Sequence, residues 1–190
     1  MRYSKEHKEG VRSQLLSESG SYAKKHGFAA TGVDALANAA GLTTGSLYKH
    51  FSNKNDLFTA VITAEIGRTV QVFENMNPDD MGTILKALAS YLSMQHVHSP
   101  ETGCLLPSLT AEVARANDDA HLAFEAGMLR FKDVVKEMTG SDTVAWTVIA
   151  QNVGAIMIAR AMQHESAKEE IINAVRTTGA QLLVEAFEKK

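Results

Sequence analysis

The chain has 190 residues, of which 45% are hydrophobic, and its formal net charge is −3 at pH 7. A single cysteine excludes an intrachain disulfide framework, no stretch reaches the ~18 apolar residues of a membrane span, and the N-terminus lacks the apolar core of a secretory signal. We therefore expect a cytoplasmic protein of one or two domains that does not enter a membrane.

The charge is unevenly distributed along the chain. Residues 1–60 hold eight Lys/Arg and five Asp/Glu, giving +3, whereas residues 61–190 hold eleven Lys/Arg and seventeen Asp/Glu, giving −6. An excess of positive charge in the first third favours contact with phosphates there. The excess is modest, so binding would depend on individually placed contacts.

Apolar residues at helical spacing predict an all-α fold of about nine helices. Three prolines in the whole chain and long periodic runs argue against β architecture. Gly27, Gly41 and Gly140 are each placed to end a helix. The expected helices cover about 5–26, 33–40, 44–51, 54–75, 81–96, 107–117, 120–139, 142–163 and 166–188.

Two of these helices are short and meet at Gly41, as in a helix-turn-helix. The apolar stripe of the first one consists of Val33, Leu36, Ala37 and Ala40. Thr31 is placed to cap this helix, and Thr43 is placed to cap the next.

The second short helix has a narrow apolar anchor and an open polar side. At 100° per residue, Leu47 and Phe51 share one face, and Gly45 and Lys49 lie opposite. The polar residues on its two flanks are Thr44 and Tyr48, and Ser46 and His50. Small or polar groups aimed outward, with donors beside them, suit a DNA major groove. An amphipathic connector helix is the alternative interpretation.

The stretch Phe28-Ala-Ala-Thr-Gly-Val-Asp-Ala-Leu-Ala-Asn-Ala-Ala-Gly-Leu-Thr-Thr-Gly-Ser-Leu-Tyr-Lys-His-Phe-Ser-Asn-Lys-Asn-Asp-Leu-Phe58 closely resembles the DNA-binding signature of the TetR family of transcriptional regulators. The resemblance covers roughly residues 4–60. It includes Ala-Gly-Leu at the turn, Leu-Tyr-x-His-Phe, and Asn-Lys-x-x-Leu at the start of the next helix. The common Ile-Ala pair of the first motif helix is absent, and Ala35-Leu36-Ala37 is apolar in the same places.

The resemblance implies a helix-turn-helix DNA-binding domain over 1–53 and a ligand-binding and dimerisation domain over 54–190. The positions that match base-facing ones are Thr44, Gly45 and Lys49. The positions that match phosphate-holding ones are Thr31, Ser46, Tyr48, His50 and Lys54, and Thr43 joins the predicted DNA surface at the helix cap. Tyr48 as a packing aromatic and His50 as an ordinary surface histidine are the structural alternatives.

The last two expected helices have apolar faces wider than one core contact needs. The small residues that would permit close helix approach are Gly154, Ala155, Ala161, Gly179 and Ala180. A homodimer through these helices explains the pattern, and the resembling family pairs them across a two-fold axis. Two copies would then read a palindromic operator in double-stranded DNA. A two-sided buried helix in a monomer is the alternative.

The resemblance also implies a small-molecule effector bound between the middle helices. The candidate lining residues are Phe73, Leu88, Tyr91, Leu92, Gln95, Cys104, Leu105, Leu109, Phe124, Met128, Phe131, Trp146 and Gln151. Apolar residues at this spacing are equally typical of plain core. Nothing in the sequence identifies the effector's charge, and we expect no cofactor.

Cys104 follows a glycine at an expected helix start, where the helix dipole favours a reactive thiolate. Some TetR-type sensors of electrophiles carry a cysteine in a similar Gly-Cys-Leu setting. A small buried hydrophobic residue is the structural alternative. His96 and His98 lie near it in sequence, but they would not share a helix face, so we expect no metal site.

The sequence therefore favours a ligand-responsive DNA-binding regulator, a repressor by the usual behaviour of the family. Two alternatives remain open, namely an electrophile- or redox-sensing regulator that uses Cys104, and a helical protein-interaction module. We do not expect an enzyme, because no nucleophile–base pair or metal set has persuasive spacing.

Overall fold

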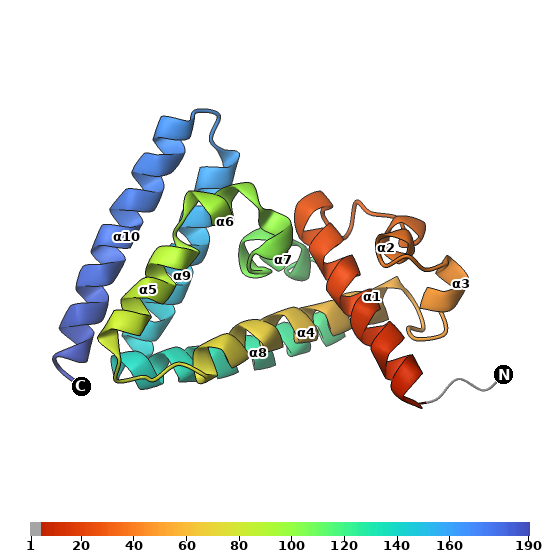
Figure 1. Ribbon diagram of the computed structural model, residues 1–190, viewed down its shortest axis with the longest axis horizontal. Coiled ribbons are helices and arrows are strands. Elements are labelled where there is room, and N and C mark those ends of the chain that lie inside the picture. The colour runs from red at the N-terminus through yellow and green to blue at the C-terminus, as the bar shows by residue number, and fades with distance from the viewer. Residues whose placement is uncertain (1–4) are drawn as a thin grey trace. The chain divides into compact units, whose positions relative to one another are not determined.

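A computed structural model describes residues 5–190 of the chain. Residues 1–4 lie outside the described residues. They include the start of the predicted 1–53 domain and Ser4, the first residue of the resembling stretch. The described residues form ten α-helices and one 3-10 helix and contain no strand, which confirms the all-α prediction (Figure 1). The elements are α1 (Lys5–His26), α2 (Val33–Ala39), α3 (Thr44–Leu47), α4 (Lys54–Glu74), α5 (Met81–Tyr91), α6 (Met94–His98), η1 (Pro100–Thr102), α7 (Leu106–Val113), α8 (Asp118–Thr139), α9 (Asp142–Ala161) and α10 (Glu165–Phe187).

One predicted helix, 81–96, is divided into α5 and α6. The break follows Tyr91, and the Ser93 hydroxyl then accepts a hydrogen bond from the His96 amide, which starts α6 as an N-cap. The His96 ring Nδ1 donates to the Tyr91 carbonyl oxygen at 2.8 Å. These polar contacts replace helical hydrogen bonds, so the apolar period alone could not reveal the break.

The predicted helix stops are confirmed at three glycines. Gly27, Gly41 and Gly140 have φ angles of 81°, 67° and 69°, in the left-handed region that only glycine enters at little cost.

The chain divides into two compact units. The first contains the chain up to Gly67 together with Pro100–Glu125, and the second contains Arg68–Ser99 and Ala126–Lys190. Both α4 and α8 contribute residues to each unit. The boundary predicted after residue 53 differs from this division, because the first turns of α4 pack with α1 and its following loop. That functional boundary remains a prediction.

The first unit has its core where α1, α2, α3 and the start of α4 meet. The core residues, all 3% exposed or less, include Leu15, Ala23, Phe28, Leu36, Ala37, Leu47, Phe51, Leu57, Val61 and Ile62. Phe28 stacks on Phe58 with ring centroids 4.3 Å apart, which joins the loop after α1 to α4. Helices η1 and α7 also pack against α1.

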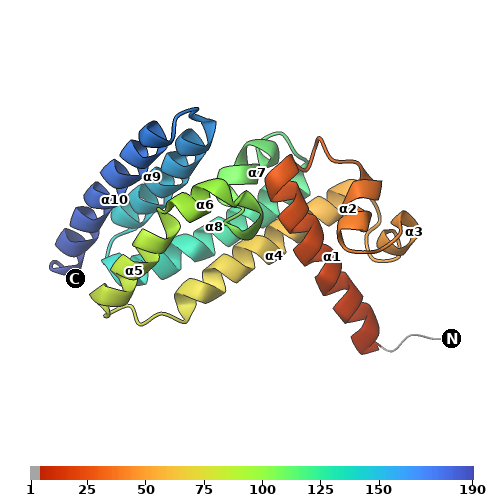
Figure 2. The ribbon, with the colours of Figure 1, turned by 45° about the horizontal axis from the view of Figure 1, so that its top comes forward.

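The second unit is built on α9 and α10, which lie side by side in both views (Figures 1 and 2). Helix α5 packs on α10, and α6 packs on both α9 and α10. The stripe of α9 that faces this core consists of Ala145, Val148, Ile149, Asn152, Ala155, Ile156 and Ala159.

Within the described residues, α9 is long and apolar enough to cross a membrane by length and composition. The expectation that no stretch could do so is corrected to that extent. The core helices of globular proteins can have the same length and composition. In this structure α9 packs against α6 and α10, so apolar residues of α9 form part of the core of the second unit.

Candidate nucleic-acid interface

Helix α3 ends at Leu47, earlier than the predicted residue 51, and hydrogen-bonded turns continue the segment to Phe51. Two apolar residues hold this segment, Leu47 at the end of α3 and Phe51 after the turns, and its other sides are open. Leu47 and Phe51 are 0% and 2% exposed, whereas Tyr48 is 48% exposed. Gly45 and Lys49 are also exposed, on the side opposite the anchor. The predicted two-residue anchor is therefore confirmed, and the polar side of α3 is available to a partner.

The start of α3 is fixed by Thr43, as the sequence predicts. Its hydroxyl oxygen accepts a hydrogen bond from the Ser46 amide at 3.2 Å, and the two hydroxyls are also 3.2 Å apart. Thr43 and Ser46 therefore form one polar edge at the N-terminus of α3. A phosphate at this edge would find hydroxyl donors already in place.

The hydroxyl of Thr44 donates to the carboxylate of Asp34 in α2. This bond joins the two helices of the motif through polar groups as well as through apolar packing. Thr44 can contact a base through its methyl group without breaking the bond, or through its hydroxyl after exchanging Asp34 for a base acceptor.

Thr31 does not cap α2, and that prediction is wrong. The N-cap is Gly32, with no side-chain cap, and Thr31 is 6% exposed. Its hydroxyl turns back to donate to the Gly27 carbonyl oxygen. The side chain therefore satisfies a carbonyl at the end of α1 instead of an amide at the start of α2.

Lys54 stands at the first residue of α4, beside the loop that follows α1. Its Nζ donates to the Ala29 carbonyl oxygen at 3.0 Å and lies 5.2 Å from the centre of the Phe28 ring. The helix start is fixed by Asn53 and Asp56. The Asn53 side chain accepts from the Asp56 amide at 2.9 Å, and the Asp56 carboxylate accepts from the Ser52 amide at 2.8 Å. Lys54 is thus half-buried and oriented before any partner arrives.

Positive charge gathers around His50. Desolvation by burial, followed by the charges of Arg12, Lys8 and Lys49, lowers the pKa of His50 below its ordinary value. The guanidinium of Arg12 also lies 4.9 Å from the centre of the Phe51 ring. We call Lys8, Arg12, Lys49 and His50 the cationic corner. Sequence reasoning missed Lys8 and Arg12, although both lie on one side of the first predicted helix.

Residues 21–61 match the family model described as "Bacterial regulatory proteins, tetR family". The matched segment contains α2, α3, the turn between them and the start of α4. The matched segment is the helix-turn-helix DNA-binding segment of the TetR family of transcriptional regulators. Helices α2 and α3 and the turn between them have the helix-turn-helix arrangement of that DNA-binding segment.

Several solved structures have the same fold over nearly the whole chain. The reduced form of NemR from E. coli is 21% identical, with a TM-score of 0.72 over 88% of this chain and 96% of that one. A TetR-family regulator from Cytophaga hutchinsonii is 21% identical, with a TM-score of 0.70 over 97% and 98%. FadR from Bacillus subtilis, solved with stearoyl-CoA, is 12% identical, with a TM-score of 0.67 over 92% and 98%.

The predicted effector residues fall in both units. Those in the second unit are Phe73, Leu88, Tyr91, Leu92, Gln95, Met128, Phe131, Trp146 and Gln151, and those in the first are Cys104, Leu105, Leu109 and Phe124. Phe73 and Phe131 meet edge to face, with ring centroids 5.2 Å apart. Trp146 is 40% exposed and Gln95 is exposed, so these two lie at the surface of the chain.

Two amide groups on α9 are buried without a hydrogen-bond partner among the described residues. They are Nε2 of Gln151 and Oδ1 of Asn152. A Cβ atom on Gly179 of α10 would come within 2.9 Å of Gln151 Nε2 and 3.6 Å of Leu88. The glycine therefore allows α10 to approach Gln151 closely, and the Gln151 amide is a donor available to a bound molecule.

The histidines and the cysteine have separate surroundings. His98 Nε2 lies 2.9 Å from the Glu165 carboxylate, and Sγ of Cys104 accepts from the Leu106 amide at 3.4 Å. Within residues 5–190, no group of three or more His, Cys, Asp or Glu side chains is placed to hold a metal ion.

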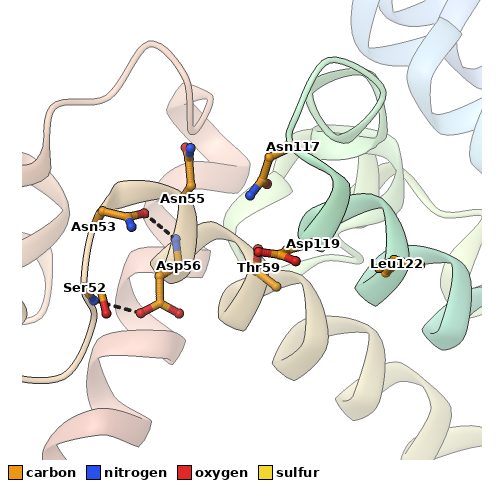
Figure 3. A pocket seen from close by; sticks show the side chains of 8 residues that line it. All are labelled: Ser52, Asn53, Asn55, Asp56, Thr59, Asn117, Asp119 and Leu122. Atoms are coloured by element: carbon orange, nitrogen blue, oxygen red, sulfur yellow. Dashed lines mark hydrogen bonds between the residues drawn. The ribbon is translucent and has the colours of Figure 1, made fainter.

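A polar pocket of about 580 Å³ lies in the first unit, between the start of α4 and the start of α8 (Figure 3). Its lining residues are Ser52, Asn53, Asn55, Asp56, Thr59, Asn117, Asp119 and Leu122. None of them is a predicted effector contact. Asn53 and Asp56 are already engaged in the cap of α4, as the dashed lines in Figure 3 mark.

Sequence reasoning also missed three charged residues that join distant segments of the first unit. Lys24 pairs with Glu65 in a buried contact, and Glu112 binds the loop after α1. Their partners lie 41 to 84 residues away along the chain, so no local pattern identifies them.

Proposed function

We propose that this DNA-binding regulator is a homodimeric repressor that a small-molecule effector releases from a palindromic operator. The observation that carries the proposal is the open face of α3 and of the turns that follow it, with Gly45 and Lys49 exposed between two polar flanks and Leu47 and Phe51 buried behind it. A face of this size reads only a few bases, so specificity would require two copies at a fixed spacing.

The proposed base contacts come from Thr44, Gly45 and Lys49. The proposed phosphate contacts come from Thr31, Thr43, Ser46, Tyr48, His50 and Lys54. The cationic corner adds positive charge beside them. Because Thr31 is buried and bonded to Gly27, its contribution would be to fix the loop, with a phosphate contact only at its surface edge.

Binding to duplex DNA at several salt concentrations tests the phosphate contacts. Lys54→Ala and Tyr48→Phe should weaken binding to all sequences by a similar factor, and Lys54→Ala should reduce the magnitude of the salt slope by roughly one. Lys49→Ala should change base preference at particular positions. A uniform loss in Lys49→Ala across all sequences would instead assign that lysine to a phosphate.

The proposed dimer interface is the outer face of α9 and α10. Five of the nine exposed large hydrophobic residues of the described chain belong to these helices or to the residue that ends α9, which favours a covered surface there. They are Trp146, Met157, Ile158, Met162 and Val184. A Cβ atom added at Gly154 would have no heavy atom within 4 Å, so α9 could approach a second copy closely at this point.

The proposed effector site is in the interior of the second unit, near the unpartnered amides of Gln151 and Asn152. FadR, which shares the fold, was solved with stearoyl-CoA, so helical domains of this kind can hold a large ligand. To release DNA, the effector must bind the free conformer more tightly than the DNA-bound one. Such a protein would work in the cytoplasm, where the DNA is.

Cys104 supports a second candidate, in which the trigger is an electrophile or oxidant. Its Sγ accepts a backbone hydrogen bond at the start of α7, an arrangement that favours thiolate. Cys104→Ser should leave DNA binding intact and abolish release by an electrophile such as N-ethylmaleimide. An unchanged response in the variant would rule out this trigger. The alternative of a protein-interaction module is tested by the same DNA-binding measurement, because such a module would not bind duplex DNA.

A further inference from the structure

The carboxylate of Glu112, in α7, binds two successive backbone amides of the loop after α1. One oxygen accepts from the Phe28 amide at 3.0 Å, and the other accepts from the Ala29 amide at 2.6 Å. A charged acceptor shared between two amides is stronger than an ordinary backbone hydrogen bond. Gly27 adjoins this contact with a φ of 81°, and a Cβ there would lie 3.1 Å from the carboxylate. The loop is thus shaped to receive Glu112.

The same loop orients Lys54 from its other side. The Ala29 carbonyl accepts from Lys54 Nζ at 3.0 Å, and Phe28 presents its ring 5.2 Å from that nitrogen. The amides of this loop therefore donate to the Glu112 carboxylate, and the Ala29 carbonyl accepts from Lys54. A rotation of these peptide groups that breaks the first contact also moves the second.

The segment that carries Glu112 is attached to α1 at other points. Lys24 Nζ donates to the Gly103 carbonyl at 2.8 Å, and the Ser21 hydroxyl donates to the Glu101 carbonyl at 2.8 Å. These contacts hold the segment before α7 to the body of α1, whereas Glu112 reaches the loop that orients Lys54. A shift of α7 relative to α1 would therefore act on this loop through Glu112.

We propose that Glu112 is a positioning residue for DNA binding, which holds the Phe28–Ala29 loop so that Lys54 faces a phosphate. Displacement of α7 would then break the hydrogen bonds between Glu112 and this loop and lower the affinity for DNA. The inference depends on the phosphate contact proposed above for Lys54. It identifies the link by which α7 can control that contact, and it predicts that Glu112 and Lys54 act as one unit.

The test is a double-mutant cycle on the full chain, with Glu112→Gln and Lys54→Ala, alone and together. Binding to a duplex is followed by fluorescence anisotropy at several salt concentrations. Glu112→Gln should weaken binding about fivefold to tenfold and reduce the salt slope by roughly one, because the variant loses one phosphate contact. In the Lys54→Ala background, Glu112→Gln should have almost no further effect.

Glu125→Gln is the matched control. Glu125 is exposed on α8 in the first unit, and its substitution changes the net charge by the same amount. Removing a negative charge should by itself leave DNA binding unchanged or slightly stronger. If Glu112→Gln binds DNA more weakly than the parent and Glu125→Gln does not, the loss comes from positioning and not from the change in net charge.

Each outcome has one meaning. If Lys54→Ala binds DNA as the parent does, the proposed phosphate contact fails. If Lys54→Ala weakens binding but Glu112→Gln does not, or if the two losses multiply, the positioning role is overturned. Should Glu112→Gln fail to fold, Glu112→Asp takes its place with the same expected sign, because the shorter side chain keeps the charge but loses reach. Faster hydrogen exchange at the Phe28 and Ala29 amides should accompany either variant.

Discussion

Lys24 and Glu65 form a buried ion pair, with Nζ and Oε2 2.8 Å apart and side chains 5% and 6% exposed. The pair joins α1 to α4, and Lys24 also donates to the Gly103 carbonyl. Gly20 makes room for it, since a Cβ there would lie 3.0 Å from Glu65 Oε1. Buried charges of this kind stabilise a fold only while both partners are present.

Breaking this pair should destabilise the protein more than deleting it. Lys24→Met leaves the Glu65 charge buried and should lower the free energy of unfolding by about 3 kcal/mol or more, whereas Lys24→Met with Glu65→Leu should recover most of the loss. Chemical denaturation of the parent protein and of these two variants measures the difference. Equal losses in the single and double variants would show that the pair contributes nothing specific.

Gly45→Ala should impair DNA binding without harming the fold. A Cβ at Gly45 would meet only Thr43 Oγ1, at 3.9 Å, and alanine is the better helix former by about 1 kcal/mol, so the melting temperature should stay the same or rise. The added methyl group would project into the space proposed for base edges and should weaken binding at least tenfold by the loss of close approach. Gly67→Ala is the control, because Gly67 also has open space but lies far along α4. Undiminished DNA binding by Gly45→Ala would mean that this side of α3 does not face DNA.

DNA affinity should rise as the pH falls through the titration of His50. In the free protein burial and neighbouring cations lower the pKa of His50, so the imidazole is mostly neutral at pH 7 and charges only at lower pH. A nearby phosphate would raise the pKa in the complex, so binding takes up a proton and becomes tighter on acidification. The same charging costs stability in the free protein. Anisotropy between about pH 7.5 and 5.5 measures the slope, and His50→Gln should reduce it; an identical slope in the variant would assign the proton to another group.

Met157→Glu should convert the protein to a monomer and abolish tight operator binding. Met157 and Trp146 fall within about 20° of each other on α9 at 100° per residue, so they share the proposed interface. They are both 40% exposed in the single chain, and a charge buried there by a second copy would be unpaired. Sedimentation velocity gives the mass. The control is Val72→Glu, because Val72 is 58% exposed and lies on α4, outside the proposed interface of α9 and α10. Retention of the dimer by Met157→Glu, or its loss in both variants, would contradict this interface.

Local patterns predicted much of the helix-turn-helix. The buried Leu47 and Phe51, the cap at Thr43 and the stop at Gly41 all depend on residues within a few turns of each other, so period and capping rules were sufficient. Thr31 failed as a cap because a hydroxyl can bond either the preceding carbonyl or the following amide, and the sequence does not say which.

Contacts between distant segments could not be predicted. Glu112 and Phe28 are 84 residues apart in the sequence, and Lys24 and Glu65 are 41 apart, so only the packing of the folded chain brings each pair together. The break between α5 and α6 was missed for a related reason, since Arg160 from α9 donates to the His96 carbonyl and stabilises the short helix. In the sequence alone, a charged residue on a helix cannot be told from solvated surface until its partner is known.

Footprinting of the full chain on the DNA upstream of its own gene tests the central claim most directly. The account predicts two protected half-sites related by a two-fold axis, with centres about one helical turn or a multiple of it apart. Lys49→Ala should shift the protected sequence, and Met157→Glu should remove the protection. No protection of any duplex by the parent protein at low salt, or protection of a single unpaired site by a monomer, would contradict the account.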